Sequence, residues 1–281
     1  MSGKVVLVTG AAQGQGRAHA VVCASEGADI ILLDIAKQIP TAISSMGTRE
    51  ELAETARQVK DHDQRALVIE ADVRSQRELD DAVAAGIAEF GHIDALCANA
   101  GISSLAPFWE MTEEQWDDLI GVNLTGVWKS AKAVAPHMIE RKTGSMVFTS
   151  SVNALEPAPG LSHYTSAKHG LLGLMKSVAL EMAPYNVRCN SVGPGAIDTA
   201  MVDNQRAYDW FAGHEGGTRE DAVRGGRHYH ALKGRSLMAP EVVAKAAMFL
   251  NSELAEAVTG VNLPVDAGHS LLTGFNHAPT L

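Results

Sequence analysis

A glycine-rich turn near the start of the chain stands between a short apolar run and a helical stretch. The run at 5–8 leads directly into Thr9-Gly10-Ala11-Ala12-Gln13-Gly14-Gln15-Gly16, and the helical stretch follows at 17–26. Glycine allows the backbone to turn sharply and to approach a pyrophosphate, whose charge is received by amide groups at the helix N-terminus. An acid, Asp34, follows the second apolar run. This order of strand, turn, helix and acid favours an α/β fold that binds a dinucleotide.

The rest of the chain repeats the alternation of β-type runs and helical stretches. Because the runs are nearly continuous in apolar residues, they suit a parallel sheet with helices on both faces. No internal repeat or linker interrupts the pattern, so we predict one doubly wound α/β domain over 1–281. The runs lie at 5–8, 29–33, 66–70, 95–98, 145–149, 188–192 and 261–265. Three helix starts match a capping box, in which two side chains satisfy backbone amides: Thr48-x-x-Glu51, Ser75-x-x-Glu78 and Thr112-x-x-Gln115.

Charge and composition exclude several classes of function. Lys and Arg number 23 against 33 Asp and Glu, a net charge of −10, and the absence of a dense basic stripe argues against nucleic-acid binding. No apolar run approaches the roughly 18 residues that span a bilayer, and the N-terminus has no signal-peptide pattern. Cys23, Cys97 and Cys189 form no C-x-x-C motif, so we interpret them as small buried thiols. We expect a cytoplasmic metabolic enzyme without a metal or a membrane partner.

Asp34 decides between the two nicotinamide dinucleotides. Its carboxylate is expected to accept hydrogen bonds from the ribose hydroxyls of the adenosine, whereas a 2′-phosphate would meet like charge. Ile35 and Gln13 offer no cation for a phosphate, and Arg17 is expected on the helix surface. We therefore predict NAD rather than NADP; an ordinary turn acid at the end of a strand is the alternative.

Tyr164 and Lys168 form a Tyr-x-x-x-Lys pair, which on a helix puts a phenol and an ammonium one turn apart on the same face. A free tyrosine titrates at about 10, and a nearby cation favours the phenolate and lowers that pKa. We therefore expect Tyr164 to be an acid/base and Lys168 to lower its pKa. Ser151 follows the apolar run at 145–149 and is placed to hydrogen-bond the oxygen being oxidised. A surface pair without chemistry is the alternative.

Two connections are unusually long. The one at 34–48 exceeds the about two to six residues that usually join a strand to a helix. The one at 199–236 carries aromatic residues between glycines, which predicts a mobile lid that closes over a hydrophobic substrate, with an irregular surface excursion as the alternative. Residues that flank the motifs are further candidates for the pocket wall: Trp109, Leu155, His163 and Met201.

In their order and spacing, the motifs make nearly the whole chain resemble a classical short-chain dehydrogenase/reductase. They are Gly10-x-x-x-Gly14-x-Gly16, Asn99-Ala100-Gly101, Asn123, Ser151, Tyr164-x-x-x-Lys168 and Pro194-Gly195. The resemblance implies a Rossmann-like sheet of seven strands, one for each run above, with helices on both faces. It also implies a homotetramer.

The resemblance further implies roles that spacing alone does not assign. Asn123 supports a water chain from Lys168 to solvent, and Lys168 also binds the nicotinamide ribose. Asp72 and Val73 contact the adenine, although Asp72 also fits an acid at a helix approach. The NAD-binding residues expected in this way are Gly10, Gln13, Gly14, Gln15, Gly16, Asp34, Ile35, Asp72, Val73, Asn99, Ala100, Gly101, Tyr164, Lys168, Pro194, Gly195, Ile197 and Thr199. Ile197 and Thr199 hold the carboxamide of the nicotinamide.

Within the family, the chain is more similar to the mycofactocin-associated, carveol-dehydrogenase-like branch. The stretches at 9–17, 83–101 and 167–175 carry this likeness, and the long connection at 34–48 agrees with it. In that branch an insertion after the second strand covers the adenosine and hinders release of NAD, which a redox partner then re-oxidises in place. Here the insertion is shorter and has fewer prolines, and Pro194-Gly195 follows the general family.

We predict an NAD-dependent oxidoreductase that interconverts a secondary alcohol and its ketone, acting on a CH–OH group. Tyr164 is the acid/base, Lys168 and Asn123 assist it, and Ser151 orients the substrate oxygen. The aromatic lid favours a hydrophobic or cyclic alcohol. The alternatives are a reductase of carbonyl or ketoacyl compounds, a nucleotide-binding sensor without catalysis, and a zinc enzyme suggested by His228-x-His230.

Overall fold

The computed structural model describes residues 1–272, and the last nine residues of the domain predicted over 1–281 lie outside that range. Its sheet has seven strands in the order β3-β2-β1-β4-β5-β6-β7, and every neighbouring pair is parallel. The strands are β1 (Val5–Thr9), β2 (Asp29–Asp34), β3 (Ala66–Glu70), β4 (Ala95–Ala98), β5 (Gly144–Thr149), β6 (Val187–Pro194) and β7 (Asn262–Val265). The predicted seven-stranded parallel sheet is confirmed, with shifts only at strand ends.

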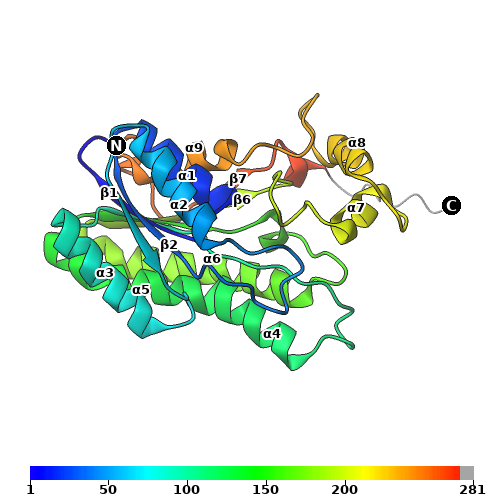
Figure 1. Ribbon diagram of the computed structural model, residues 1–281, viewed down its shortest axis with the longest axis horizontal. Helices are drawn as coiled ribbons and strands as arrows, with labels where there is room; N and C mark the ends of the chain where they lie inside the picture. Colours follow the sequence, from blue (N-terminus) through cyan, green and yellow to red (C-terminus); the bar gives the residue numbers. More distant parts are fainter. Residues whose placement is uncertain (273–281) are drawn as a thin grey trace.

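Helices cover both faces of this sheet (Figure 1). One face carries α1 (Gly14–Ser25), α2 (Arg49–Lys60) and α9 (Glu241–Asn251), and the other carries α3 (Gln76–Phe90), α5 (Val127–Arg141) and α6 (Ser162–Met182). Helix α4 (Glu113–Ile120) joins α5 through a π-helical turn, Gly121–Gly126. Helices α7 (Gln205–Ala212) and α8 (Arg219–Tyr229) lie beyond one end of the sheet.

The sequence of β1 is continuously apolar because both faces of the strand are buried. Successive side chains of a strand point to opposite faces, so Val5 and Leu7 enter the core under α3, α5 and α6, whereas Val6 and Val8 enter the core under α1 and α2. Both sets are almost fully buried. Burial on two faces leaves no polar position in such a strand, as the sequence pattern predicted.

The predicted capping boxes are confirmed at Thr48 and Thr112, where both reciprocal hydrogen bonds are present. The prediction is half wrong at Ser75. Its hydroxyl accepts from the amide of Glu78, but the Glu78 carboxylate accepts from the amide of Asp72 instead of closing the box. The acid is therefore used to fix the loop after β3.

The strand order places a candidate binding site at the carboxyl ends of β1 and β4. The chain runs outward from β1 to β2 and β3, then returns to β4 on the other side of β1. Connections leave in opposite directions at such a point and open a crevice between the loops, where open α/β sheets bind their ligands.

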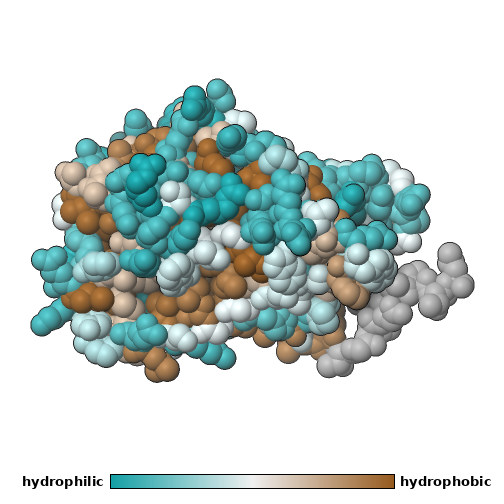
Figure 2. Space-filling view, turned by 90° about the horizontal axis from the view of Figure 1, so that it is seen from below, coloured by the Kyte–Doolittle hydropathy of each residue, from teal (hydrophilic) through white to brown (hydrophobic). Residues whose placement is uncertain are grey.

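The three cysteines are free and buried, as predicted. Among the helices of residues 1–272, none combines the length and apolarity that crossing a bilayer requires. Figure 2 shows the molecule from below, where patches of apolar side chains lie between hydrophilic ones. Exposed apolar side chains include Trp116 of α4 and Trp128 of α5, which are 41% and 44% exposed. The homotetramer stays a prediction.

Candidate active site

The glycine-rich turn packs too closely against its neighbours to accept side chains. Gly10 has a φ of +69°, and a Cβ there would lie 2.9 Å from the Cα of Ala100. A Cβ on Gly16 would lie 1.8 Å from the carbonyl oxygen of Gly10. The turn opens directly into α1, whose first amide groups have no partners within the helix. The backbone therefore forms a cradle of the kind that fits a pyrophosphate.

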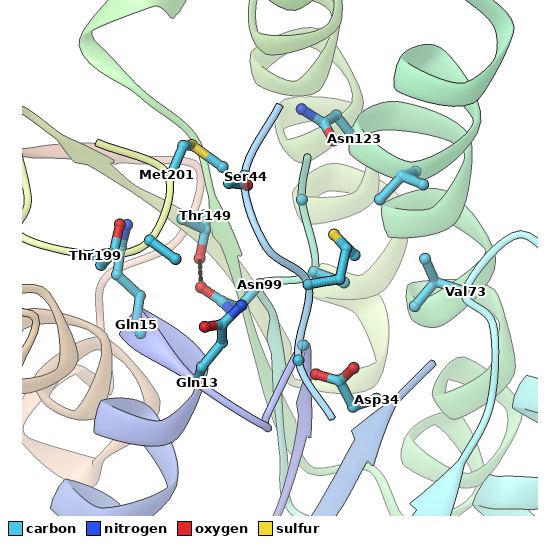
Figure 3. Close-up of a pocket in the computed structure, with 18 of the residues that line it drawn as sticks. Gln13, Gln15, Asp34, Ser44, Val73, Asn99, Asn123, Thr149, Thr199 and Met201 are labelled. Carbon is cyan, nitrogen blue, oxygen red and sulfur yellow. Dashed lines mark hydrogen bonds between the residues drawn. The ribbon is translucent and has the colours of Figure 1, made fainter. Parts of the chain in front are cut away.

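A single pocket at the crevice brings the predicted site residues together (Figure 3). Asp34 and Val73 lie at one end, Thr199 and Met201 at the other, and Asn99 between them. The predicted residues that line the pocket are Gly10, Gln13, Gly14, Gln15, Asp34, Ile35, Asp72, Val73, Asn99, Ala100, Gly101, Asn123, Ser151, Tyr164, Lys168, Pro194, Gly195, Ile197 and Thr199. Gly16 does not line the pocket; it lies against the carbonyl oxygen of Gly10 and lets the turn close.

Asp34 ends β2 inside this pocket and is only 6% exposed. Its carboxylate accepts hydrogen bonds from the backbone amides of Ala12 and Ala36, each at 3.0 Å. Burial raises the pKa of Asp34, and these amide hydrogen bonds oppose the rise. The two amide hydrogen bonds thus fix the carboxylate oxygens at this end of the pocket. Their contact with ribose hydroxyls stays a prediction.

The sequence analysis predicted Arg17 on the helix surface, but its side chain binds other parts of the chain. Its guanidinium donates to the carbonyl oxygens of Ala12 at 2.6 Å and Glu51 at 3.0 Å, and to the Thr55 hydroxyl at 3.0 Å. The prediction was wrong because α2 packs beside α1 and supplies these acceptors. All three contacts join Arg17 to the protein itself rather than to a phosphate.

Residues 35–47, here called the cover loop, contain no helix or strand and lie against the pocket. The backbone amide of Ile43 donates to the carbonyl oxygen of Ser103 at 3.0 Å, and the Gln13 amide donates to the carbonyl of Ser45 at 2.8 Å. Besides the predicted Ile35, five of its residues line the pocket: Ile39, Ser44, Ser45, Met46 and Gly47. The sequence identified the loop by its length but not these residues.

A network of charged side chains fixes the cover loop at its outer side. The Thr41 hydroxyl donates to Asp118 at 2.7 Å, and Arg74 donates to the other oxygen of Asp118 at 2.6 Å. Arg74 also pairs with Asp72 at 2.7 Å. Asp72 therefore lines the pocket while its carboxylate holds Arg74. Its contact with the adenine stays a prediction.

Tyr164 and Lys168 lie one turn apart on α6, as predicted. The Lys168 ammonium lies 5.5 Å from the centre of the Tyr164 ring and donates to the carbonyl oxygen of Thr149 at 2.7 Å. Burial lowers the pKa of Lys168 to about 8. The Ser151 hydroxyl, in the same pocket, accepts from the backbone amide of Asn153 at 3.1 Å.

The expected lowering of the tyrosine pKa by Lys168 is wrong for this structure. Burial raises the pKa of Tyr164, and the neighbouring Ser151 hydroxyl opposes that rise. The physical reason is that the Lys168 ammonium donates to the Thr149 carbonyl and so does not offset the desolvation of the phenol. Tyr164 is consequently a phenol at neutral pH, the form that donates a proton.

Asn123 is fully buried within the π-helical turn between α4 and α5. Its amide oxygen accepts from the backbone amide of Ile102 at 2.8 Å, and its amide nitrogen donates to the carbonyl of Ile102 at 2.9 Å. Both partners belong to one backbone unit, so Asn123 fixes the loop after β4. Its predicted part in a water chain stays a prediction.

Half of the segment at 199–236 is helical, because it contains α7 and α8, so the alternative of an irregular excursion is wrong. The mobile lid stays a prediction. Its aromatic rings pack on one another: Trp210 contacts Phe211 edge-on at 4.8 Å, and both contact Tyr229. His230 is buried, and one ring nitrogen lies 3.1 Å from the carbonyl oxygen of Gly226. Within residues 1–272, no group of three or more metal-ligating side chains gathers.

The further candidates for the pocket wall divide. Met201 lines the pocket. Trp109 and Leu155 are 71% and 53% exposed and lie outside its lining. Trp109 lines a second pocket, together with Phe108 and Pro159. His163 is buried and lies outside the lining, with a ring nitrogen 2.6 Å from the Ser104 hydroxyl. Adjacent helix residues point in different directions, which separates His163 from Tyr164.

A doubly wound domain with a pyrophosphate cradle, and with a Ser, a Tyr and a Lys in the same pocket, defines a nucleotide-dependent oxidoreductase as its class. The chain belongs to the short-chain dehydrogenase family, since the family model described as short chain dehydrogenase matches residues 4–210.

Relatives of known name span almost the whole chain. The (-)-trans-carveol dehydrogenase of Rhodococcus erythropolis is 42% identical, with 96% of this chain and 99% of the relative covered. The crystal structure of carveol dehydrogenase from Mycobacterium avium in complex with NAD has a TM-score of 0.93 and 40% identity. The match covers 97% of this chain and 99% of the other. An NAD-bound short chain dehydrogenase from Mycobacterium paratuberculosis has a TM-score of 0.86 and 32% identity, covering 96% and 99%.

Proposed function

We propose that the protein is an NAD-dependent oxidoreductase that interconverts a secondary alcohol and its ketone. The observation that carries the proposal is the meeting of Ser151, Tyr164 and Lys168 in the pocket that also contains Asp34 and the glycine-rich turn. The carveol dehydrogenases, at 42% and 40% identity, favour a hydrophobic cyclic alcohol as the substrate.

NAD fits the residues that the pocket presents. The cradle at Gly10 and Gly16 receives the pyrophosphate, and Asp34 receives the ribose hydroxyls while its charge disfavours NADP. Ile197 and Thr199, at the other end, hold the nicotinamide carboxamide. When bound, NAD supplies an acceptor for the hydride that leaves the carbinol carbon, or a donor in the reverse direction.

Three side chains perform the proton chemistry. As a phenolate, Tyr164 takes the hydroxyl proton during oxidation, and as a phenol it gives a proton to the ketone oxygen during reduction. Because burial raises its pKa, Tyr164 is a phenol that is ready to donate a proton at neutral pH. The rate of alcohol oxidation, which needs the phenolate, therefore increases as the pH rises. Ser151 hydrogen-bonds the substrate oxygen, and Lys168 binds the nicotinamide ribose beside the phenol.

We further propose that NAD leaves this pocket slowly and that a redox partner re-oxidises it in place. The support is the cover loop, whose residues line the pocket and whose Thr41 hydroxyl is tied to Asp118. A cytoplasmic location, a homotetramer and the mycofactocin link remain predictions that accompany this proposal.

The test is to purify the protein without added cofactor, denature it and quantify released NAD by mass spectrometry. In parallel, oxidation of a panel of cyclic secondary alcohols is measured with and without an artificial electron acceptor. Retained NAD with turnover that depends on the acceptor supports the proposal in full. Empty protein that produces NADH freely supports the alcohol dehydrogenase but rejects slow exchange, and a lack of oxidation of every alcohol rejects the function.

A further inference from the structure

The second pocket, here called the outer pocket, is formed by the same loops that carry the predicted catalytic residues into the first pocket. The loop after β4 lines the first pocket at Gly101 and the outer pocket at 105–109. The loop after β5 lines the first pocket at Ser151 and the outer pocket at 157–160. A backbone hydrogen bond joins the two loops, from the amide of Ala106 to the carbonyl oxygen of Gly160 at 3.1 Å. Both loops therefore lead from the first pocket into the outer one.

Helix α6 and the segment after β6 also contribute to both pockets. Tyr164 lines the first pocket, whereas Ser162 and Thr165, in the same turn of α6, line the outer pocket. Met201 lies at the end of the first pocket that is remote from the ribose acid (Figure 3), and Arg206, in the first turn of α7, lines the outer pocket. All four segments around the predicted acid/base thus continue into the outer pocket.

The size and the walls of the outer pocket suit an apolar group. Its volume is about 790 Å³, whereas an apolar cavity of about 150 Å³ is enough to bind one benzene molecule. The rings of Phe108 and Trp109 meet edge-on with centres 5.1 Å apart, and these residues are 72% and 71% exposed. Pro157 and Pro159 also line this space. A ligand here would cover aromatic surface that is otherwise exposed to water.

Arg206 is the only charged side chain among the described residues that line the outer pocket. Its guanidinium donates to the carbonyl oxygen of Leu105 at 2.8 Å, which fixes it at the loop after β4. Arg219, in the same segment, pairs with Asp198 and Asp203, but no carboxylate within residues 1–272 pairs with Arg206. Because a guanidinium has five N–H donors, Arg206 retains donors for an anionic group in the pocket.

The Thr165 hydroxyl is a second donor in the outer pocket. Its oxygen is buried and has no hydrogen-bond partner in the part of the chain that the structure describes. A buried hydroxyl without a partner is unfavourable, so an acceptor on a ligand would satisfy it. The neighbouring acid Glu110 does not line the pocket, and its carboxylate accepts from the Trp109 indole at 3.2 Å. The polar groups of the outer pocket therefore favour an anionic acceptor.

We propose that the outer pocket binds a remote arm of the substrate and that Arg206 selects an arm with an anionic end. The reacting hydroxyl lies at Tyr164, the apolar part of the arm covers Phe108 and Trp109, and the anionic end forms charge-assisted hydrogen bonds with the guanidinium. The inference rests on the proposed function and deepens it by naming a substrate class, a secondary alcohol with an apolar arm that ends in an acid.

The experiment measures kcat/KM for cyclohexanol and for two series of 4-substituted cyclohexanols. One series carries unbranched alkyl arms of increasing length, and the other carries the same arms with a terminal carboxylate. Wild type, Trp109→Ala and Arg206→Met are compared as complete chains saturated with NAD, and each value is divided by that of cyclohexanol with the same variant. The matched controls are Trp116→Ala and Arg227→Met, because both residues are exposed and line neither pocket.

In wild type, kcat/KM should rise about two- to fourfold for each methylene of the arm until the outer pocket is filled. A terminal carboxylate should add about two- to fivefold at the arm length that reaches Arg206, as expected for a partly exposed ion pair. Trp109→Ala should lose most of the gain from the arm, whereas Arg206→Met should lose only the gain from the carboxylate. Trp116→Ala and Arg227→Met should keep both gains.

Three results would each overturn the inference while cyclohexanol is still oxidised. They are a wild-type kcat/KM that does not change with the arm, equal values for neutral and carboxylate arms of every length, and wild-type gains in both outer-pocket variants. If wild type with bound NAD oxidises no alcohol, with or without an arm, the proposed function falls and the inference falls with it.

Discussion

The nucleotide end and the substrate end of the pocket are built by different physical means. Around Gly10, Gly16 and Asp34, the shape follows from backbone geometry and from two amide hydrogen bonds to one carboxylate. At the other end, beyond Thr199 and Met201, α7 and α8 are joined by contacts between aromatic side chains such as Trp210 and Tyr229. The first kind of site keeps one ligand geometry, whereas the second changes with a few substitutions, which suits an end that sets substrate specificity.

The largest expected effect is a loss of turnover at the substrate end without a loss of NAD binding at the nucleotide end. Replacing Tyr164 by Phe removes the hydroxyl that transfers the proton and keeps the ring, so turnover should fall by about 10²- to 10⁴-fold while NAD affinity changes little. Steady-state oxidation of a cyclic alcohol and calorimetric titration with NAD measure the two quantities. Normal turnover in this variant would sink the proposed mechanism.

Asp34→Ala should affect the nucleotide end alone. The variant loses a buried acceptor for the ribose hydroxyls, and hydrogen bonds to charged groups contribute about 1.5–3 kcal/mol, so NAD affinity should fall on the order of 30-fold. NADP affinity should fall much less, because the like charge is removed too. The dissociation constants of NAD and NADP test this prediction. Asp29→Ala, at the other end of β2, is the control. An unchanged preference for NAD would refute the ribose assignment.

His19 gives the nucleotide end a pH dependence that the substrate end need not share. Burial in α1 lowers its pKa from 6.5 to about 4, with the Asn99 side chain opposing. The unfolded chain therefore binds a proton first, so stability is complete above pH 6.5 and is lost as the pH falls towards 4. Between pH 7 and 5 the loss attributable to His19 is about 2 kcal/mol.

Urea unfolding at pH 7 and pH 5 measures this loss. His19→Leu should show a smaller decrease in the free energy of unfolding than wild type, whereas a variant of the exposed His62 should behave as wild type does. Identical pH dependence in wild type and His19→Leu would contradict the assignment.

The smallest expected effect concerns the cover loop. Thr41→Val removes the hydroxyl that donates to Asp118 and keeps the shape of the side chain. One hydrogen bond contributes about 1 kcal/mol, so the bound dinucleotide, NAD or NADH, should dissociate about fivefold faster, with the preference among alcohols unchanged. Stopped-flow release of NADH by fluorescence tests this. A release rate equal to that of wild type would show that the hydroxyl does not restrain the loop.

The same contrast explains what could be predicted from the sequence. The strands, the glycine-rich turn and Tyr164 with Lys168 on one helix follow from local patterns, and the structure places them as expected. Local patterns could not reveal that Arg17 binds carbonyl oxygens of its own chain, because those acceptors depend on how α2 packs. They also could not show that the Lys168 ammonium turns to Thr149 and leaves burial to dominate the tyrosine pKa.

The substrate end was the harder part to predict. Glycines and aromatics at 199–236 predicted a mobile lid, but not that the segment forms α7 and α8 with their aromatic rings packed together. No sequence pattern indicated the contact of His269 with Glu156, because the two residues lie 113 positions apart in the sequence. Contacts of this length leave no periodic signal, so only the folded arrangement brings them together.

The central claim is that a secondary alcohol gives its hydride to NAD held in this pocket, with Tyr164 taking the proton. The most direct measurement supplies a cyclic secondary alcohol with deuterium on the carbinol carbon to the NAD-loaded protein for a single turnover. The protein is then denatured, and the released dinucleotide is weighed by mass spectrometry. We predict NADH that carries one deuterium from wild type and almost none from Tyr164→Phe. Unlabelled dinucleotide from wild type, or equal labelling in both proteins, would contradict the account.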